Sequence, residues 1–173
     1  MAATIDGTTG LTAPSGAIFN GIASATAVAS TSGTSIDFTS IPSWVKRITV
    51  MFNAVSTNGS SNIIIQLGAG SVTTSGYGSS AAYTGASTTG SNTTTGFNIA
   101  FVDAGTISYG IATIATTGSN SWVYGASIGR STTAFASVGG GGVSLGGTLD
   151  RVRITTVNGT DTFDAGSINI LYE

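Results

Sequence analysis

The chain has 173 residues, a length that suits one domain with its own hydrophobic core. It contains no Cys and no His, which excludes disulfides and thiolate chemistry and removes the side chain most used for acid–base catalysis near neutral pH. Charged residues are 7% of the chain, the formal net charge is −2 and the five basic residues form no run, so nothing favours nucleic-acid binding. No stretch of about 18 uninterrupted apolar residues indicates a membrane-spanning helix.

Residues 1–30 differ in composition from the rest of the chain. They are rich in small residues and show no period of 2 or 3.6, which predicts an extended arm that becomes ordered against a partner. A passive, frayed terminus is the alternative. The arm lacks the basic start of a secretory signal, so we expect the chain to stay in the cytoplasm until assembly. The arm residues expected to enter pockets of a partner are Leu11, Ile18, Phe19 and Ile22.

Alternation of apolar and polar residues predicts a β-sandwich domain over residues 31–173. The segment 46–55 reads KRITVMFNAV, a period of 2 that is typical of a half-buried strand. The run NIIIQL at 62–67 suits a strand that is covered on both faces. The C-terminal segments LDRVRITTV and GSINILYE repeat the alternation. The residues predicted to face the interior are Ile48, Val50, Phe52, Val152, Ile154, Ile168 and Ile170.

The remaining segments support an all-β fold. Further strands are predicted at 97–102, 106–114 and 121–128, and no segment combines helical periodicity with helix caps. Eight to ten short strands with turn signals between them favour a single antiparallel β-sandwich of jelly-roll type. The run Gly139–Gly142 predicts a bulge, a hinge or a close approach of chains around an axis. The tryptophans expected in the core are Trp44 and Trp122.

Residues 68–96 form the most loop-like segment. Gly, Ser and Thr dominate it, and a structureless loop of this length would be unusual inside a compact domain. The segment therefore contains either a weak strand or an exposed functional loop. Its two isolated aromatic residues, Tyr77 and Tyr83, are candidates for outward contacts with a host-surface glycan or receptor, or for anchors that hold the loop.

The seven carboxylates are the candidates for chemistry. Asp150 with Asp164 is a conceivable glycosidase pair, but Asp150 can pair with the adjacent Arg151 and the other acids lie near turns. Asp161 and Asp164 lack the oxygen-ligand density and the spacing of a calcium-binding loop. We therefore predict no catalytic residue, no cofactor and no metal.

Two segments resemble a known group of domains: SGTSIDFTSIPSWVKRITVMFNAVSTNG at 32–59 and GGTLDRVRITTVNGTDTFDAGSINILYE at 146–173. They are similar to a domain of bacteriophage and prophage proteins that often closes the C-terminus of tail-fibre-like virion proteins. The resemblance is weak over 68–145. It implies a β-sandwich that is homotrimeric in many virions and displayed on the particle, and it supplies no catalytic motif.

Three functional hypotheses follow. The first is a non-enzymatic tail-fibre or adhesion module of a virion, whose loops contact the host surface. The second is a capsid decoration (cement) protein, in which the arm binds other phage virion proteins of the shell. The third is a surface-glycan hydrolase, which the scarcity of tunable acid–base groups disfavours.

Overall fold

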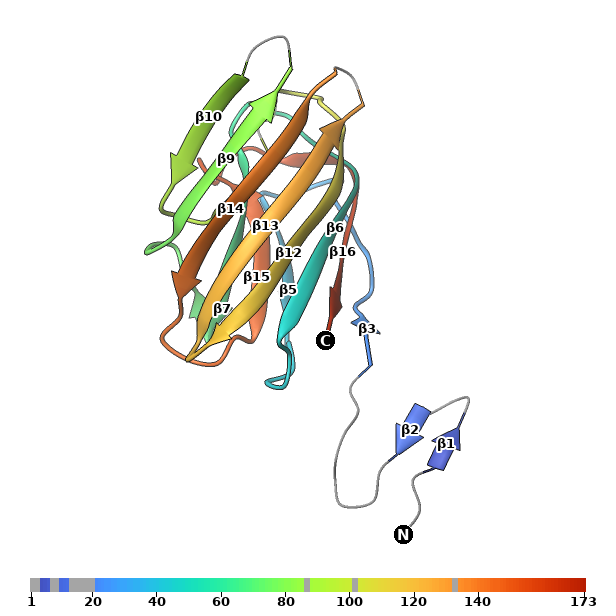
Figure 1. The fold of residues 1–173 in the computed structure, drawn as a ribbon. Helices are drawn as coiled ribbons and strands as arrows, with labels where there is room; N and C mark the ends of the chain where they lie inside the picture. Colours follow the sequence, from blue (N-terminus) through green and yellow to red (C-terminus); the bar gives the residue numbers. More distant parts are fainter. Residues whose placement is uncertain (1–3, 7–9, 13–20, 86–87, 101–102, 132–133) are drawn as a thin grey trace.

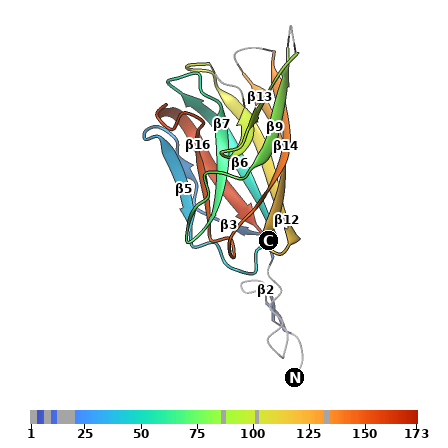
Figure 2. The same cartoon turned by 90° about the vertical axis from the view of Figure 1, so that its left-hand side faces the viewer.

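The computed structural model describes residues 4–6, 10–12, 21–85, 88–100, 103–131 and 134–173. Within these residues the chain forms strands and turns and contains no helix. Two antiparallel sheets pack face to face as a β-sandwich, which confirms the predicted fold class (Figure 1). The view turned by 90° shows the two layers, with β5 and β14 on opposite sides (Figure 2).

The large sheet contains nine strands of the described residues, and all its pairings are antiparallel. Its order is β10 (Thr88–Thr93), β9 (Gly78–Thr84), β14 (Ala136–Ser144), β13 (Ser121–Arg130), β12 (Ser108–Gly118), β6 (Arg47–Thr57), β16 (Phe163–Tyr172) and β3 (Ala23–Ser24), and β4 (Val28–Ala29) also pairs with β16. The predicted strands at 46–55, 106–114 and 121–128 lie in β6, β12 and β13. The loop-like segment 68–96 contains β9 and β10, so the weak-strand alternative holds there.

The small sheet contains five strands of the described residues. Its order is β11 (Phe97–Ala100), β7 (Ile63–Ala69), β15 (Arg151–Thr156) and β5 (Ser35–Thr39), and β8 (Ser71–Val72) also pairs with β7. The chain passes from sheet to sheet through β5, β6 and β7 and again through β15 and β16, a crossing pattern in keeping with the jelly-roll-like fold. The run at 62–67 is covered on both faces as predicted, because neighbours such as Ile64 and Ile65 are both buried.

The predicted arm is more structured than its composition suggests. Residues Thr4–Asp6 (β1) and Gly10–Thr12 (β2) form a hairpin that pairs only with itself and lies apart from the sandwich (Figure 1). From residue 23 the chain runs along the edge strand β16 through β3 and β4. Ser30 is fully buried, and its hydroxyl donates to the Ala165 carbonyl at 2.7 Å. The last part of the segment 1–30 is thus an edge of the large sheet.

The core lies between the two sheets and contains all seven strand residues predicted to face the interior. Ile48, Val50, Phe52, Val152, Ile154, Ile168 and Ile170 are all buried in one hydrophobic cluster. Trp122 also lies in the core, as predicted. Trp44 is half-buried at the end of the sandwich, where its ring packs against Tyr172 with the centroids 5.9 Å apart.

The glycine run 139–142 is neither a bulge nor a hinge, because it lies in β14 in unbroken register with β13 and β9. The close approach that explains it occurs inside the chain. A Cβ on Gly139 would lie 2.6 Å from the Tyr124 hydroxyl and 2.8 Å from the Asn98 carbonyl oxygen. Glycine therefore lets β14 sit directly on the core tyrosine.

We predict that Phe52→Ala lowers the free energy of unfolding by about 3–5 kcal/mol, because Phe52 is 4% exposed and its removal leaves a cavity. Urea denaturation measures the change. Ser60→Ala, in the exposed loop between β6 and β7, is the control and should change stability by less than about 0.5 kcal/mol. Equal effects of the two substitutions would contradict this register of β6.

Candidate functional site

Every carboxylate with a described side chain has a polar partner. Three form hydrogen-bonded ion pairs with donor–acceptor distances of 2.7 to 3.2 Å: Asp37 with Arg153, Asp103 with Arg130, and Asp150 with Arg151. Glu173 pairs with Arg47, Asp164 accepts a hydrogen bond from Ser56, and Asp161 accepts one from the Ser61 N–H at 2.9 Å. These carboxylates hold loops and strands in place through ion pairs and hydrogen bonds, which is a structural role.

Asp150 and Asp164 do not form a glycosidase pair. Asp150 precedes β15 and Asp164 follows the turn after it, so six strand residues, about 20 Å of extended chain, separate them. Glycoside hydrolysis requires carboxyl groups about 5–10 Å apart. The Arg151 guanidinium and the Gly70 N–H donate to Asp150 and hold the pKa of that carboxyl below its usual value, opposite to the shift a general acid needs.

The turn around Asp161 is held by its own polar groups. The Asn158 side chain donates to the Asp161 carboxylate at 2.6 Å and accepts from the Thr160 N–H at 3.0 Å. The Asp161 carboxylate packs against Gly59, where any side chain would collide with the carboxylate. Asp161 therefore links the Asn58-Gly59 turn with the Asn158-Gly159 turn. In the described part of the chain no three metal-ligating His, Cys, Asp or Glu residues come together.

Tyr77 does not face outward, contrary to the sequence prediction. It is 2% exposed, and its hydroxyl accepts a hydrogen bond from the Leu67 N–H at 2.7 Å. Its ring packs edge-on against Phe97 with the centroids 5.0 Å apart. The phenol satisfies a backbone donor where β7 ends and anchors the segment before β9. Of the two roles considered for Tyr77, the anchor is correct.

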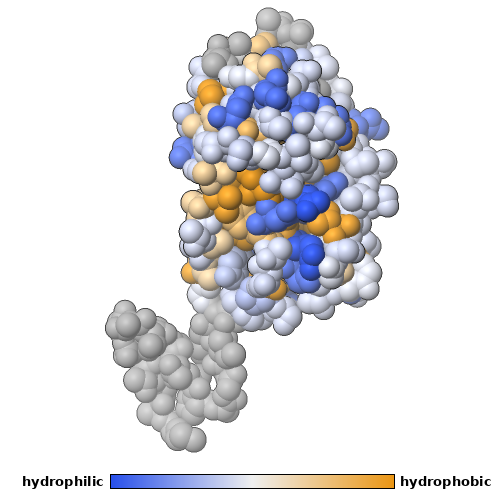
Figure 3. All heavy atoms as spheres, turned by 180° about the vertical axis from the view of Figure 1, so that it is seen from behind, coloured by the Kyte–Doolittle hydropathy of each residue, from blue (hydrophilic) through white to orange (hydrophobic). Residues whose placement is uncertain are grey.

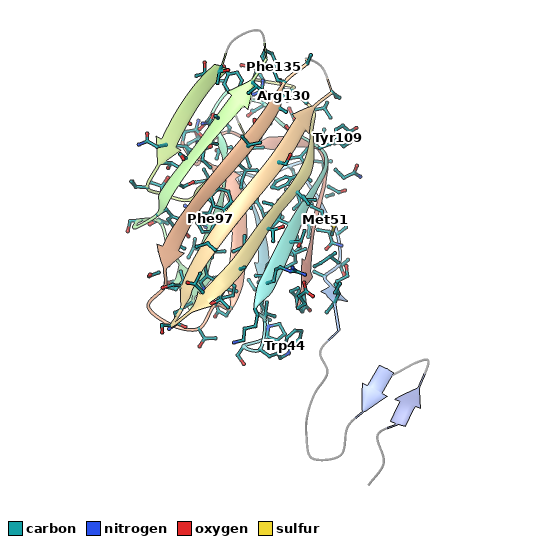
Figure 4. All side chains as sticks on the ribbon, viewed as in Figure 1. Trp44, Met51, Phe97, Tyr109, Arg130 and Phe135 are labelled. Carbon is teal, nitrogen blue, oxygen red and sulfur yellow. The ribbon has the colours of Figure 1, made fainter. Side chains whose placement is uncertain are left out.

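Tyr83 is half-buried in an aromatic cluster at the end of the sandwich opposite the arm. Its ring meets Phe135 edge-on at 5.6 Å, and the Arg130 guanidinium carbon lies 5.7 Å from its centroid. Figure 4 labels Phe135 and Arg130 at this end. Phe135 packs directly on Gly85, whose missing side chain makes room for the ring. Tyr83 thus holds neighbouring strand ends together and keeps part of its surface in solvent.

The predicted arm contacts fall largely outside what the structure describes. Ile18 and Phe19 lie outside the described residues. Leu11 lies in β2, opposite Ile5 of β1 in the hairpin register. Ile22 is exposed and lines a small hollow with Arg47 and Tyr172, where the arm leaves the sheet.

The outer face of the large sheet carries exposed hydrophobic residues. Strand alternation turns one set of side chains inward and leaves the other on the outer surface. The four exposed large hydrophobics that lie on β12, β13 and β14 are Tyr109, Ile111, Val123 and Val138. The strands β9, β10, β12 and β14 contain no charged residue at all. The sequence indicates such a face where apolar residues occupy both the inward-facing and the outward-facing positions of a predicted strand.

This outer face has two parts of different shape. Tyr109, Ile111 and Met51 form an apolar ridge on β12 and β6, where Ile111 and Met51 are direct partners (Figure 4). On the other side of β13, small residues leave a shallow hollow of about 620 Å³ over β14, β9 and β10. The outward residues that line this hollow are Ser80, Ala82, Gly90, Asn92, Val138 and Gly140.

The small sheet has a different outer surface. The ion pairs of Arg153 with Asp37 and of Arg151 with Asp150 lie on β15, β5 and their ends. The space-filling view from behind shows strongly hydrophilic groups on this side of the molecule, with hydrophobic residues between them (Figure 3). β9, β10, β12 and β14 carry no charge, whereas two ion pairs lie on β15, β5 and their ends.

Comparisons with known proteins identify no relative: no family model matches the chain, and no curated protein or solved structure matches it. Among the described residues, no helix is long and apolar enough to cross a membrane.

We predict that Tyr77→Phe destabilises the fold by about 1–3 kcal/mol at pH 8, because the buried Leu67 N–H loses its acceptor. Burial raises the pKa of Tyr77 to about 12 from 10.0. The folded state then binds this proton more tightly than the unfolded state, so the stabilisation is complete below pH 10 and is lost as the pH rises towards 12. Urea denaturation at pH 8 and pH 11 should show a smaller difference between wild type and Tyr77→Phe at pH 11. A constant difference would contradict the assignment.

Proposed function

We propose that this chain is a non-enzymatic structural module of a bacteriophage particle, and that it assembles as a homotrimer through the outer face of its large sheet. The observation that carries the proposal is the absence of charge from β9, β10, β12 and β14 together with the exposed hydrophobic residues on that side. Monomeric soluble proteins rarely expose a large apolar patch, and such patches mark interaction surfaces.

The face as a whole has about the area of one standard interface, which a cyclic arrangement divides between two neighbouring copies. Six adjacent strands at about 4.8 Å spacing and about eight residues at about 3.3 Å each span on the order of 750 Å². A standard protein–protein interface buries about 800 Å² on each partner. The side chains are short, so their immobilisation costs little entropy. Pairing of this face with another copy brings few like charges together, because β9, β10, β12 and β14 have none, and Arg130 of β13 and Arg47 of β6 are paired with carboxylates.

The ridge and the hollow favour a cyclic arrangement. They are distinct parts of one face, so the ridge of one copy can pack into the hollow of the next. Such a head-to-tail contact uses two different patches and closes into a ring when the rotation permits. The number three comes from the resemblance of residues 32–59 and 146–173 to trimeric virion domains.

That same resemblance supports the placement in a virion, most simply as a tail-fibre module. Burial of Tyr77 removes one of the two contacts on which the host-binding role of residues 68–96 rested. The capsid-decoration alternative predicts hundreds of copies per particle, as symmetric shells require, whereas a fibre predicts far fewer. Quantitative mass spectrometry of intact particles distinguishes the two.

We predict that Ile111→Asp and Val138→Asp each weaken self-association by about 30-fold, because each places a charge in the centre of an apolar interface. Sedimentation equilibrium at micromolar concentration measures the mass, with a trimer expected for the wild type. Ile111 and Val138 are 49% and 55% exposed, so a single copy tolerates both substitutions.

Val157→Asp is the matched control, since Val157 is 46% exposed but follows β15 in the small sheet. It should leave the mass unchanged. A monomeric wild-type chain would overturn the proposal, as would unchanged association of both face variants.

A further inference from the structure

The small sheet has a hollow of its own, of about 310 Å³, on its outer face. The floor of this small-sheet hollow is made by outward-facing residues of β5, β15 and β7, namely Ser35, Arg153, Thr155 and Gln66. Its walls are the turn after β15 and the segments before β9 and β11, which contribute Thr74 and Thr95. Most of the side chains that line the hollow carry a hydroxyl or an amide, so its surface is polar.

A row of three polar side chains fixes this floor. Strand register places Asp37, Arg153 and Gln66 side by side on β5, β15 and β7. Their strand neighbours, such as Ile154 and Ile65, are buried in the core, so the row faces outward. The Arg153 Nε and Nη2 groups donate to the two Asp37 carboxylate oxygens at 2.7 and 2.9 Å. This pairing holds the guanidinium in place and leaves its Nη1 group without a partner among the described residues.

Gln66 presents an unused acceptor to the small-sheet hollow. The residue is 7% exposed, and its Nε2 group donates to the Thr95 carbonyl at 2.9 Å, which orients the amide. Its Oε1 accepts no hydrogen bond from the described residues and is not among their buried unpaired atoms, so this acceptor is open to the hollow that the residue lines. An acceptor held in this way favours a ligand that brings a donor to it.

The charges at the hollow favour a neutral ligand. Arg153 is the one charged residue that lines it in the described part of the chain, and the Asp37 carboxylate neutralises that charge. An anionic ligand would have to compete with Asp37 for the same guanidinium. The groups left open are the Gln66 Oε1, the Arg153 Nη1 and the hydroxyls of Ser35 and Thr74, neither of which makes a hydrogen bond with a described residue. The hollow therefore offers both donors and acceptors without net charge.

Backbone pairing and size favour a sugar over a peptide. β15 lies between β5 and β7, so the backbone of the floor is already hydrogen-bonded and an extended peptide has no strand edge to join. The volume lies at the lower end of the range for small-ligand pockets, which suits a single ring. Each hydroxyl of a pyranose both donates and accepts, which matches the mixed set of open groups. Val157, 46% exposed, also lines the hollow and adds apolar surface for the C–H groups of such a ring.

We propose that the small-sheet hollow binds one pyranose ring of a neutral saccharide. The Gln66 Oε1 accepts from one sugar hydroxyl, and the Arg153 Nη1 donates to another. The Ser35 and Thr74 hydroxyls complete the polar contacts. The proposal adds a ligand to the structural role proposed above. It does not depend on that assembly, because the hollow lies on the other sheet.

Titration of the full-length chain with methyl glycosides, followed by ¹⁵N–¹H correlation spectra, tests the proposal. The probes are the neutral methyl glycosides of glucose, galactose, mannose and N-acetylglucosamine, with methyl glucuronide as the anionic comparator. At least one neutral glycoside should shift the side-chain amide signals of Gln66 and Asn158, with a Kd on the order of 1 mM, as expected for a ligand of about a dozen non-hydrogen atoms. Absence of such shifts with every neutral glycoside at about 50 mM would overturn the proposal, and so would binding of the glucuronide alone.

Two substitutions on one strand locate the binding. Ser35→Ile places a larger, apolar side chain on the floor and should raise the Kd at least about tenfold, because it fills space and removes a hydroxyl. Thr39→Ile is the matched control, since Thr39 faces the same way on β5 but does not line the hollow, and it should leave the Kd unchanged. Equal Kd values for the two variants would place the sugar elsewhere and refute the site.

A third variant tests the acceptor. Gln66→Leu should raise the Kd about 3- to 10-fold, the usual effect of losing one hydrogen bond. The correlation spectrum of each variant shows whether it is folded, and Ser35→Ile keeps the test decisive if the buried Gln66 does not tolerate substitution. Sedimentation of the same samples reports on self-association, so loss of sugar binding with an unchanged mass contradicts this proposal alone.

Discussion

The packing of the two inner faces against each other is the interaction on which the rest of this structure depends. β6 and β16 present isoleucine, valine and phenylalanine to β7 and β15, and the side chains at the centre of both sheets are almost completely buried. With no disulfide and little charge, this core supplies the main stabilising term. The requirement for close packing also explains Gly139, where a side chain would push β14 away from Tyr124.

The outer faces are free of that requirement, and they differ. The small sheet carries ion pairs that fix strand ends, such as Arg153 with Asp37 across β15 and β5. β9, β10, β12 and β14 of the large sheet carry serine, threonine, alanine and glycine with exposed Ile111 and Val138. Neither residue contributes to the core. Their common location on one side of one sheet is the observation on which the self-association proposed above rests.

The parts of the fold that the sequence predicted are those in which large apolar residues alternate. β6, β15 and β16 were predicted because apolar residues recur at period 2, and β7 because its isoleucines form a nearly continuous apolar run. β9 and β10 were predicted only as one of two alternatives, and β14 was not predicted as a strand, because alanine, serine and glycine show almost no contrast between inner and outer positions. Tyr77 was misplaced because its hydrogen bond to Leu67 depends on a turn that no local pattern reveals. The outer face emerged only from the register of strands far apart in the chain.

Because charged residues are scarce in this chain, most of the charged side chains of the sandwich have a specific structural role. Where most proteins have a surplus of solvated lysine and glutamate, here the four arginines each pair with a carboxylate and few ionic groups remain. Polar cohesion inside the sandwich is carried instead by neutral groups, such as the Tyr124 hydroxyl that donates to the Asn98 carbonyl at 2.6 Å and joins β13 to β11. A surface built in this way has weak long-range electrostatic steering, so partner choice depends on shape and on the few charges that are left.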